Sequence, residues 1–169
     1  MSSQAPNYDL TLVDRIINLI RNTELGGRMR EFYYGDPIDI PTDSVPCFIA
    51  ELQNTNIIQG PTGMDFVTQE VLLKIVINIK SYYDIQGDNE MAGQRALEEM
   101  AQGLNPATSQ YDATSIVGII RQNFTLVNFA TNQTMQIKYG VMPRGEELVT
   151  SEVHIRFIVE NFQMTPNKV

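Results

Sequence analysis

Residues 64–80, MDFVTQEVLLKIVINIK, form the longest predicted strand of the chain. Apolar side chains at alternate positions are typical of a β-strand that buries one face, and here they are Val67, Val71, Leu73, Ile75, Ile77 and Ile79. The other face holds Glu70, Lys74 and Asn78, interrupted by Leu72 and Val76. These two apolar residues predict that the second face is also partly covered, by a helix or by a neighbouring subunit.

A second predicted strand begins at Val45, fades at Gln53 and leads to the turn Gly60-Pro61-Thr62-Gly63, which predicts a hairpin. At about 3.3 Å per residue, residues 66–80 would extend roughly 50 Å. A compact domain of 169 residues is about 40 Å across. Either the hairpin overhangs its own core and is completed by another subunit, or a bulge near Thr68 and Gln69 absorbs the excess.

Helical spacing of apolar residues predicts helices over residues 10–23 and 89–103, the first capped by Asp9 or Thr11 and followed by the flexible pair Gly26-Gly27. Residues 33–46 carry three prolines and predict a loop or an irregular edge strand. The apolar run after Asp112 fits a short helix or a strand, and we favour the helix. Two further strands are expected over residues 136–142 and 152–162, around a turn at Pro143-Arg144-Gly145.

This order of elements predicts an α+β fold with a mostly antiparallel sheet of about four strands and two or three helices packed on one face. The length suits a single domain over residues 1–169, with a flexible N-terminal arm at 1–8 and a polar C-terminal tail at 163–169. The first residues lack the features of a signal peptide, and no apolar run approaches the roughly 20 residues of a membrane span. We therefore expect a protein made in the cytoplasm, with no membrane association.

Acidic residues are unevenly distributed along the chain. The net charge is −8, and residues 31–73 contain seven acids and no lysine or arginine. Phosphate binding draws on clustered basic residues, so tight binding of nucleic acid is not expected. The loop residues Asp36, Asp39 and Asp43 are interpreted either as a solvated surface or as a surface that repels DNA or attracts a basic partner.

Candidates for catalysis or for metal and cofactor binding are few. One cysteine (Cys47) and one histidine (His154) cannot build a Cys/His zinc site, and neither lies in a motif for a nucleophile and its base. The spacing of the three aspartates differs from that of a calcium-binding loop, and no glycine-rich phosphate loop is present. We therefore predict no catalytic residue, no metal, no cofactor and no enzymatic activity.

Several segments together resemble the tail terminator proteins of long-tailed bacteriophages and the related neck-completion proteins. They lie between residues 9 and 163 and read LTLVDRIINLIRN, VPCFIAEL, VTQEVLLKIVINIKSYYD, MAGQRALEEMAQGL and EVHIRFIVENF. The resemblance implies a structural virion protein that forms a homohexameric ring on the tail tube, stops its growth and offers a docking surface to the head–tail connector. DNA would pass through this ring without tight binding.

The expected contacts of such a ring are with copies of the same chain, with the tail tube protein and with the connector or neck protein. We expect subunit or tube contacts at Gly60, Pro61, Thr62, Gly63, Leu72 and Val76, and an acidic channel or partner surface at Asp36, Asp39 and Asp43. Two alternatives stay open: a homo-oligomeric module that binds a small ligand, and a head-completion or neck protein of the same virion.

Overall fold

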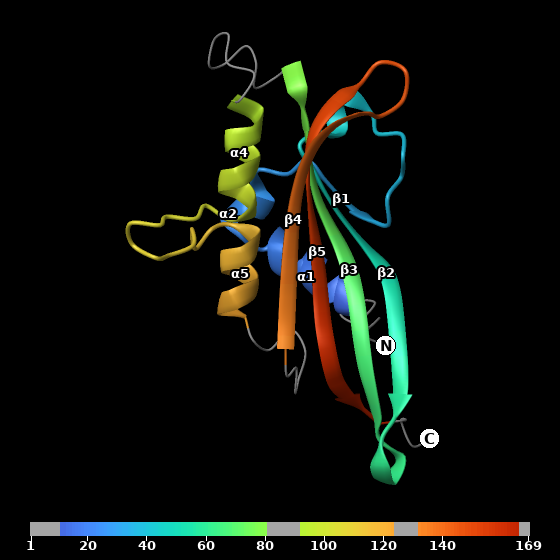
Figure 1. The fold of residues 1–169 in the computed structure, drawn as a ribbon. Helices are drawn as coiled ribbons and strands as arrows, with labels where there is room; N and C mark the ends of the chain where they lie inside the picture. Colours follow the sequence, from blue (N-terminus) through green and yellow to red (C-terminus); the bar gives the residue numbers. More distant parts are fainter. Residues whose placement is uncertain (1–10, 81–91, 124–131, 166–169) are drawn as a thin grey trace, which may run out of the picture.

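The computed structural model describes residues 11–80, 92–123 and 132–165 and has the predicted α+β architecture (Figure 1). Five strands form one mixed sheet in the order β1-β2-β3-β5-β4. They are β1 (Glu31–Tyr34), β2 (Cys47–Gln59), β3 (Asp65–Asn78), β4 (Asn132–Pro143) and β5 (Val149–Met164). All neighbouring strands are antiparallel except β1 and β2, which are parallel. The sheet therefore has one strand more than predicted.

The first helix, α1 (Leu12–Arg21), lies within the predicted range of 10–23 and is two residues shorter at each end. Thr11 is its N-cap: the Thr11 hydroxyl accepts a hydrogen bond from the Asp14 amide, and the Asp14 carboxylate accepts one from the Thr11 amide. The other predicted cap, Asp9, lies outside the described residues. Gly26-Gly27 is not a flexible linker, because it forms the end of the short helix α2 (Glu24–Gly27).

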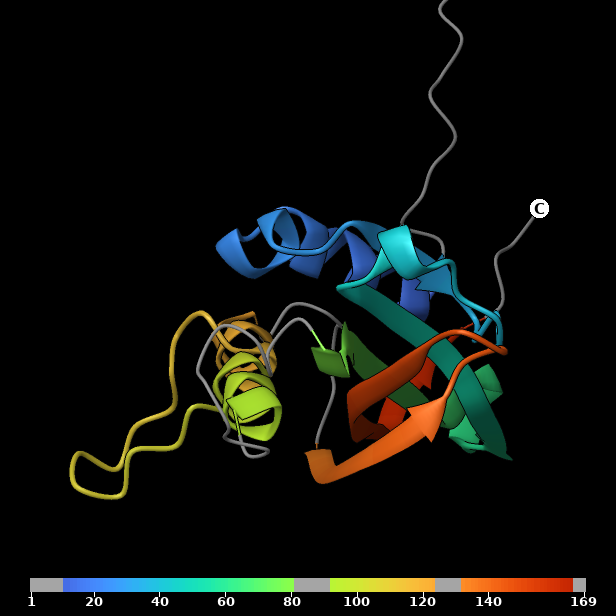
Figure 2. The same cartoon turned by 90° about the horizontal axis from the view of Figure 1, so that it is seen from above.

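Two further helices complete the layer that covers the sheet. They are α4 (Ala92–Ala101), whose predicted first residues lie outside the described part, and α5 (Ile116–Gln122), which Ser115 caps. Buried residues of α1, α4 and α5 share one core with alternate residues of β3 and β5, so the helices pack on a single face of the sheet (Figure 2). None of the described helices is both long enough and apolar enough to span a membrane.

The β2–β3 hairpin is longer than predicted. β2 does not fade at Gln53 but continues to Gln59, because each residue from Asn54 onward pairs with β3 and this pairing overrides the poor strand preference of asparagine. Gln53 is an extra residue of β2 at a shift of register with β3. At the shift between β3 and β5, Glu160 and Asn161 lie opposite Thr68, so the bulge considered for the long strand at Thr68 and Gln69 belongs to its neighbour β5. Even so, the hairpin extends past the ends of the helices in Figure 1.

The second face of the sheet is covered over its upper half by this chain's own loop. Ile40, Val45 and Leu148 pack there against Cys47, Ile49 and Val76. Val76 is fully buried in this small cluster. The expectation that a helix or another subunit covers Val76 is therefore wrong, since the proline-rich loop after β1 supplies the cover.

Gly26 and Gly27 offer a matched test of packing around α1. A Cβ atom on Gly26 would lie 2.2 Å from the carbonyl oxygen of Ile20, whereas one on Gly27 would meet nothing within 4 Å. We expect Gly26→Ala to lower the free energy of unfolding by about 2 kcal/mol or more, and Gly27→Ala to leave it unchanged or slightly raised. Urea denaturation of both variants measures this; equal stabilities would contradict the described packing.

Candidate assembly surface

The outer half of β2 is an open strand edge. Residues 47–50 are buried and pair with β1 on their outer side, but this pairing ends at Ala50, whose carbonyl accepts a hydrogen bond from the Gly35 amide (2.8 Å). From residue 52 to residue 59 every side chain is exposed, and no described strand pairs with the outer side. The backbone groups on that side are available to a partner strand.

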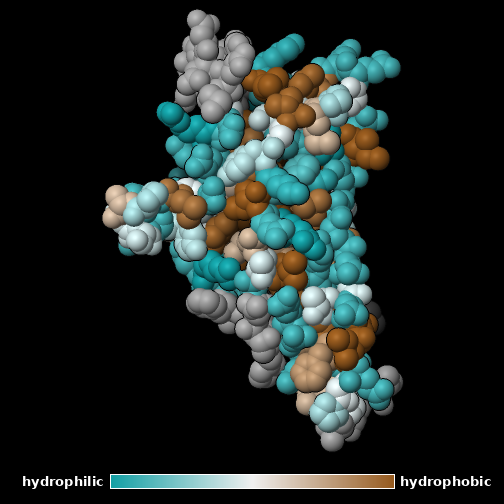
Figure 3. Space-filling model, in the orientation of Figure 1, coloured by the Kyte–Doolittle hydropathy of each residue, from teal (hydrophilic) through white to brown (hydrophobic). Residues whose placement is uncertain are grey.

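The composition of this edge distinguishes it from most exposed edges. Residues 52–59 read LQNTNIIQ and contain no charged residue and no proline, the two devices with which proteins usually protect an edge strand. Ile57 is 62% exposed and Ile58 is 52% exposed. Figure 3 shows apolar side chains among polar ones towards this end of the molecule. We call residues 52–59 the free β2 edge.

The turn at the hairpin tip forms at the predicted residues. Pro61–Gly63 make one turn of 3-10 helix, and the Gly60 amide donates to the Met64 carbonyl (2.8 Å). Gly63 has a positive φ of 77°, a conformation that glycine adopts without strain. Pro61 and Gly63 are exposed, and Thr62 lies between them in the turn. The tip therefore occupies the far end of the hairpin, and its role in contacts remains a prediction.

Leu72 and Val76 do not share a surface in the way the sequence suggested. Val76 is excluded as a contact residue because the loop cluster buries it completely. Leu72 is half-buried and lies further along the same face, opposite Glu51 and Arg156 on the adjacent strands. Of this pair only Leu72 is accessible to a partner.

The three loop aspartates do not form one acidic surface. Asp36 makes ion pairs with Lys74 and Arg144, so its charge is neutralised within the protein. Asp39 and Asp43 are exposed. The backbone carbonyl of Asp43 accepts a hydrogen bond from Arg30. The prediction of a joint acidic surface is therefore wrong for Asp36, because bases distant in the sequence meet it in the fold.

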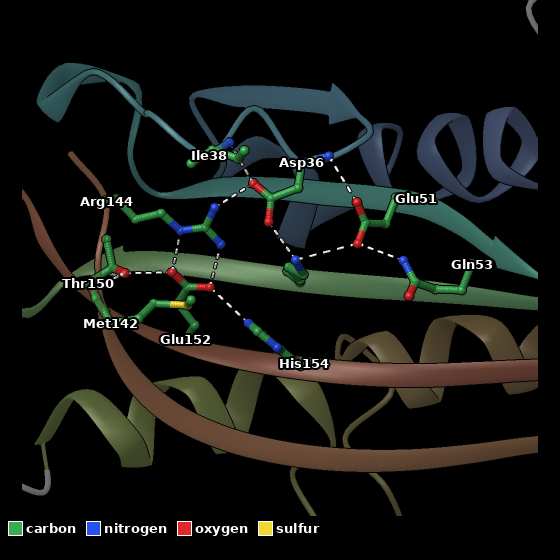
Figure 4. A network of polar contacts seen from close by, with 10 residues as sticks. Asp36, Ile38, Glu51, Gln53, Met142, Arg144, Thr150, Glu152 and His154 are labelled. Carbon is green, nitrogen blue, oxygen red and sulfur yellow. Dashed lines mark hydrogen bonds and ion pairs between the residues drawn. The ribbon is translucent and has the colours of Figure 1, made fainter.

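Arg144 is the centre of a buried polar network on the second face (Figure 4). Its Nε and one terminal nitrogen donate to the two carboxylate oxygens of Glu152, each at 2.7 Å, and its other terminal nitrogen contacts Asp36. Glu152 also accepts from the Thr150 hydroxyl (2.5 Å) and lies 2.8 Å from Nε2 of His154. Lys74 joins Asp36 to Glu51, whose carboxylate lies 3.6 Å away. The network fastens the loop after β1 to three strands.

The pKa values of the carboxylates follow from these contacts. Burial of Glu152 opposes its ionisation, but the hydrogen bonds from Arg144, His154 and Thr150 outweigh burial and lower its pKa to about 2. The pKa of Asp36 is likewise lowered, because the contacts with Arg144 and Lys74 outweigh its burial. Both carboxylates are ionised at neutral pH, and the network is a set of charges compensated inside the protein.

The residues considered for chemistry are placed as follows. Burial raises the pKa of the Cys47 thiol to about 12, so this cysteine is a poor nucleophile. His154 lies beside Glu152 within the network. Within the described ranges, no group of three or more His, Cys, Asp or Glu side chains could hold a metal ion.

One shallow pocket has a volume of about 70 Å³, which is small beside the roughly 300–1,000 Å³ of usual ligand sites. Its lining is largely polar and includes Glu24, Arg28, Glu99, Asp112 and Thr114. This pocket is therefore smaller than a usual small-ligand site.

Arg144 and Glu152 were not predicted as partners from the sequence. A signal was present, since Thr150, Glu152 and His154 occupy alternate positions on one face of a strand whose other face carries Val153, Ile155 and Phe157. Three polar residues on one face of such a strand indicate a polar network rather than a solvated face.

The chain matches no protein-family model, and no curated protein matches its sequence.

Removal of Arg144 should destabilise the protein strongly. Arg144→Ala leaves the carboxylate of Glu152, which is 1% exposed, buried without its main partner, and we expect a loss of about 3–5 kcal/mol in the free energy of unfolding. The matched control is Arg156→Ala, which breaks the exposed pair with Glu70 and should have a much smaller effect. Urea denaturation compares the two; similar losses would contradict the assigned role of the network.

Stability should fall in acid because of Glu152. Its pKa rises from about 2 in the folded protein to its ordinary 4.5 on unfolding, so its contribution is complete above pH 4.5 and is lost as the pH falls towards 2. Glu152→Gln should flatten this part of the pH dependence, measured as the free energy of unfolding between pH 7 and pH 2.5. An unchanged slope in the variant would show that other groups cause the acid loss.

Proposed function

We propose that the protein is a non-enzymatic structural subunit that forms the terminator ring at the neck end of a phage tail tube. One observation carries the proposal: the free β2 edge is exposed, uncharged and unprotected by proline. Such an edge is a natural docking surface for another polypeptide. In this proposal the ring is a homohexamer that stops growth of the tube and receives the head–tail connector.

The distribution of cover over the sheet supports an assembly role. The helices and the loop after β1 bury the upper half of the sheet on both faces, whereas the hairpin extends beyond both. In this hairpin β3 still places Val67 and Val71 in the core, whereas the outer half of β2 contributes nothing to it. Its length is accounted for if the hairpin contacts neighbouring subunits or the end of the tube.

The charges of the polar network are paired within the protein, which also favours a function that depends on surface contacts with other proteins. The ionised groups brought together by the fold, Asp36, Lys74, Arg144 and Glu152, bind one another. None is left with an open coordination that would suit a substrate. Asp39 and Asp43 remain exposed and give the loop a negative surface, which suits a ring through which DNA passes without tight binding.

Assembly on tail tubes provides the test. Tube protein is polymerised with and without this protein, and tube lengths are measured by electron microscopy. We expect uniform tubes with a ring at one end when the protein is present, and heads should join only capped tails. If tube length is unchanged and heads join uncapped tails equally well, the terminator proposal is wrong. If the protein binds to heads and leaves the length of the tubes unchanged, the neck-completion alternative is favoured.

Replacing apolar side chains at the free β2 edge should separate folding from assembly. The double variant Ile57→Asn, Ile58→Asn should keep the wild-type unfolding midpoint, because both side chains are exposed, and should lose most of its capping activity. The control is Leu104→Asn, Tyr111→Asn, which changes two exposed apolar residues in the projecting loop at the far side of the molecule. Loss of capping in the control alone would contradict the assignment to the hairpin.

A further inference from the structure

The sheet has a second open edge opposite the first. β4 ends the strand order, and β5 is the one strand with which it pairs among the described residues. Its sequence, NQTMQIKYGVMP, contains a single charged residue, Lys138. The sheet therefore presents two unpaired edges, one on each side, and each carries backbone donors and acceptors that lack a strand partner.

We infer that the free β2 edge of one subunit pairs with β4 of the next copy, so that the sheets of neighbouring subunits join into one continuous sheet. This inference rests on the proposed ring. The strand directions fit, because β2, β3, β5 and β4 alternate in direction and β2 therefore runs opposite to β4. A neighbour placed with the same orientation brings its β4 to β2 as an antiparallel partner.

The two faces of the joined sheet would match in character. On the helix side, Ile57 lies opposite the core residue Val67, and β4 presents Met135, Ile137 and Tyr139 packed against the same core. On the other side the exposed residues are Asn54, Asn56 and Ile58 of β2 and Thr134, Gln136 and Lys138 of β4. Ile57 would thus meet apolar side chains and the two asparagines would meet polar ones without opposing like charges, whereas Ile58 adds one apolar side chain to the polar face.

In the alternative arrangement, two β2 edges pair with each other about a two-fold axis, and fewer backbone donors and acceptors find a partner. It would cover β2 in both copies and leave both β4 edges open, whereas pairing of β2 with β4 uses both edges of every subunit when the ring closes. Closure of a sheet also requires a stagger between its ends. That stagger is present, because Thr55 is level with Gln133 across the sheet and residues 57–59 of β2 extend beyond the start of β4.

Disulfide cross-linking between subunits tests this pairing. The native Cys47 is fully buried, so cysteines introduced on the surface can be oxidised selectively. Asn56→Cys marks β2, and Thr134→Cys, Gln136→Cys and Lys138→Cys mark successive exposed positions of β4 on the same face. Facing residues of paired strands lie within the Cα separation that a disulfide spans. Equimolar mixtures of one β2 variant and one β4 variant are assembled and then oxidised.

We expect a cross-linked dimer in at least one of the three mixtures, at several-fold higher yield than in a mixture of Asn56→Cys with Thr108→Cys, a control in the projecting loop. Cross-linking of Asn56→Cys with itself would establish the two-fold pairing and overturn the inference. Rings that form without any mixed cross-link would overturn it too and leave the terminator proposal standing. Failure of the unmodified protein to form rings, alone or on tubes, would overturn both.

Discussion

The guanidinium of Arg144 joins parts of the chain that are distant in the sequence, and the arrangement of the second sheet face depends on it. It binds Glu152 on β5 with two hydrogen bonds and reaches Asp36, 108 residues away, in the loop after β1. Buried ion pairs add little net stability, because both charges lose their hydration. A fold that separates the two charges is strongly disfavoured, so the pair restricts how the chain can be arranged. Here the ion pairs hold the proline-rich loop against the sheet, where Ile40 and Val45 of the loop keep Cys47 and Val76 out of contact with water.

The sheet divides into two parts near Ala50. In the part that contains β1, both faces are buried, by helices on one face and by the loop after β1 on the other. In the other part β2 loses its parallel neighbour at Ala50 and becomes an exposed edge. The outer half of β2 therefore holds no core residue, although β3 and β5 still bury Val67 and Phe162 at that level, and in the proposed ring this half of β2 would contact a neighbour.

Local patterns in the sequence predicted the elements that depend on local interactions. The helix after Thr11, the strand of residues 65–78 and the short helix after Ser115 follow from periodicity and capping. The parallel strand β1 has four residues, too few for a periodic signal. The run of acids from residue 31 to residue 73 indicated an unpaired surface because the bases that pair with it lie beyond it in sequence. These bases are Lys74, Arg144 and Arg156, and the acids they neutralise are Asp36, Glu51 and Glu70. Pairing at that separation requires the three-dimensional fold.

Two bulges, one on β2 and one on β5, also bear on solubility. The extra residue of the first is Gln53, and the second places Glu160 and Asn161 (φ 53°) opposite Thr68, so both fall towards the hairpin end of the sheet. Bulges increase the local twist of a strand. Stacking of chains into amyloid-like fibrils requires flat edges that pair identically many times over. An edge strand that carries a bulge, as β2 does at Gln53, departs from this flat geometry, so an uncharged strand can stay exposed and, in the proposed ring, still accept one partner.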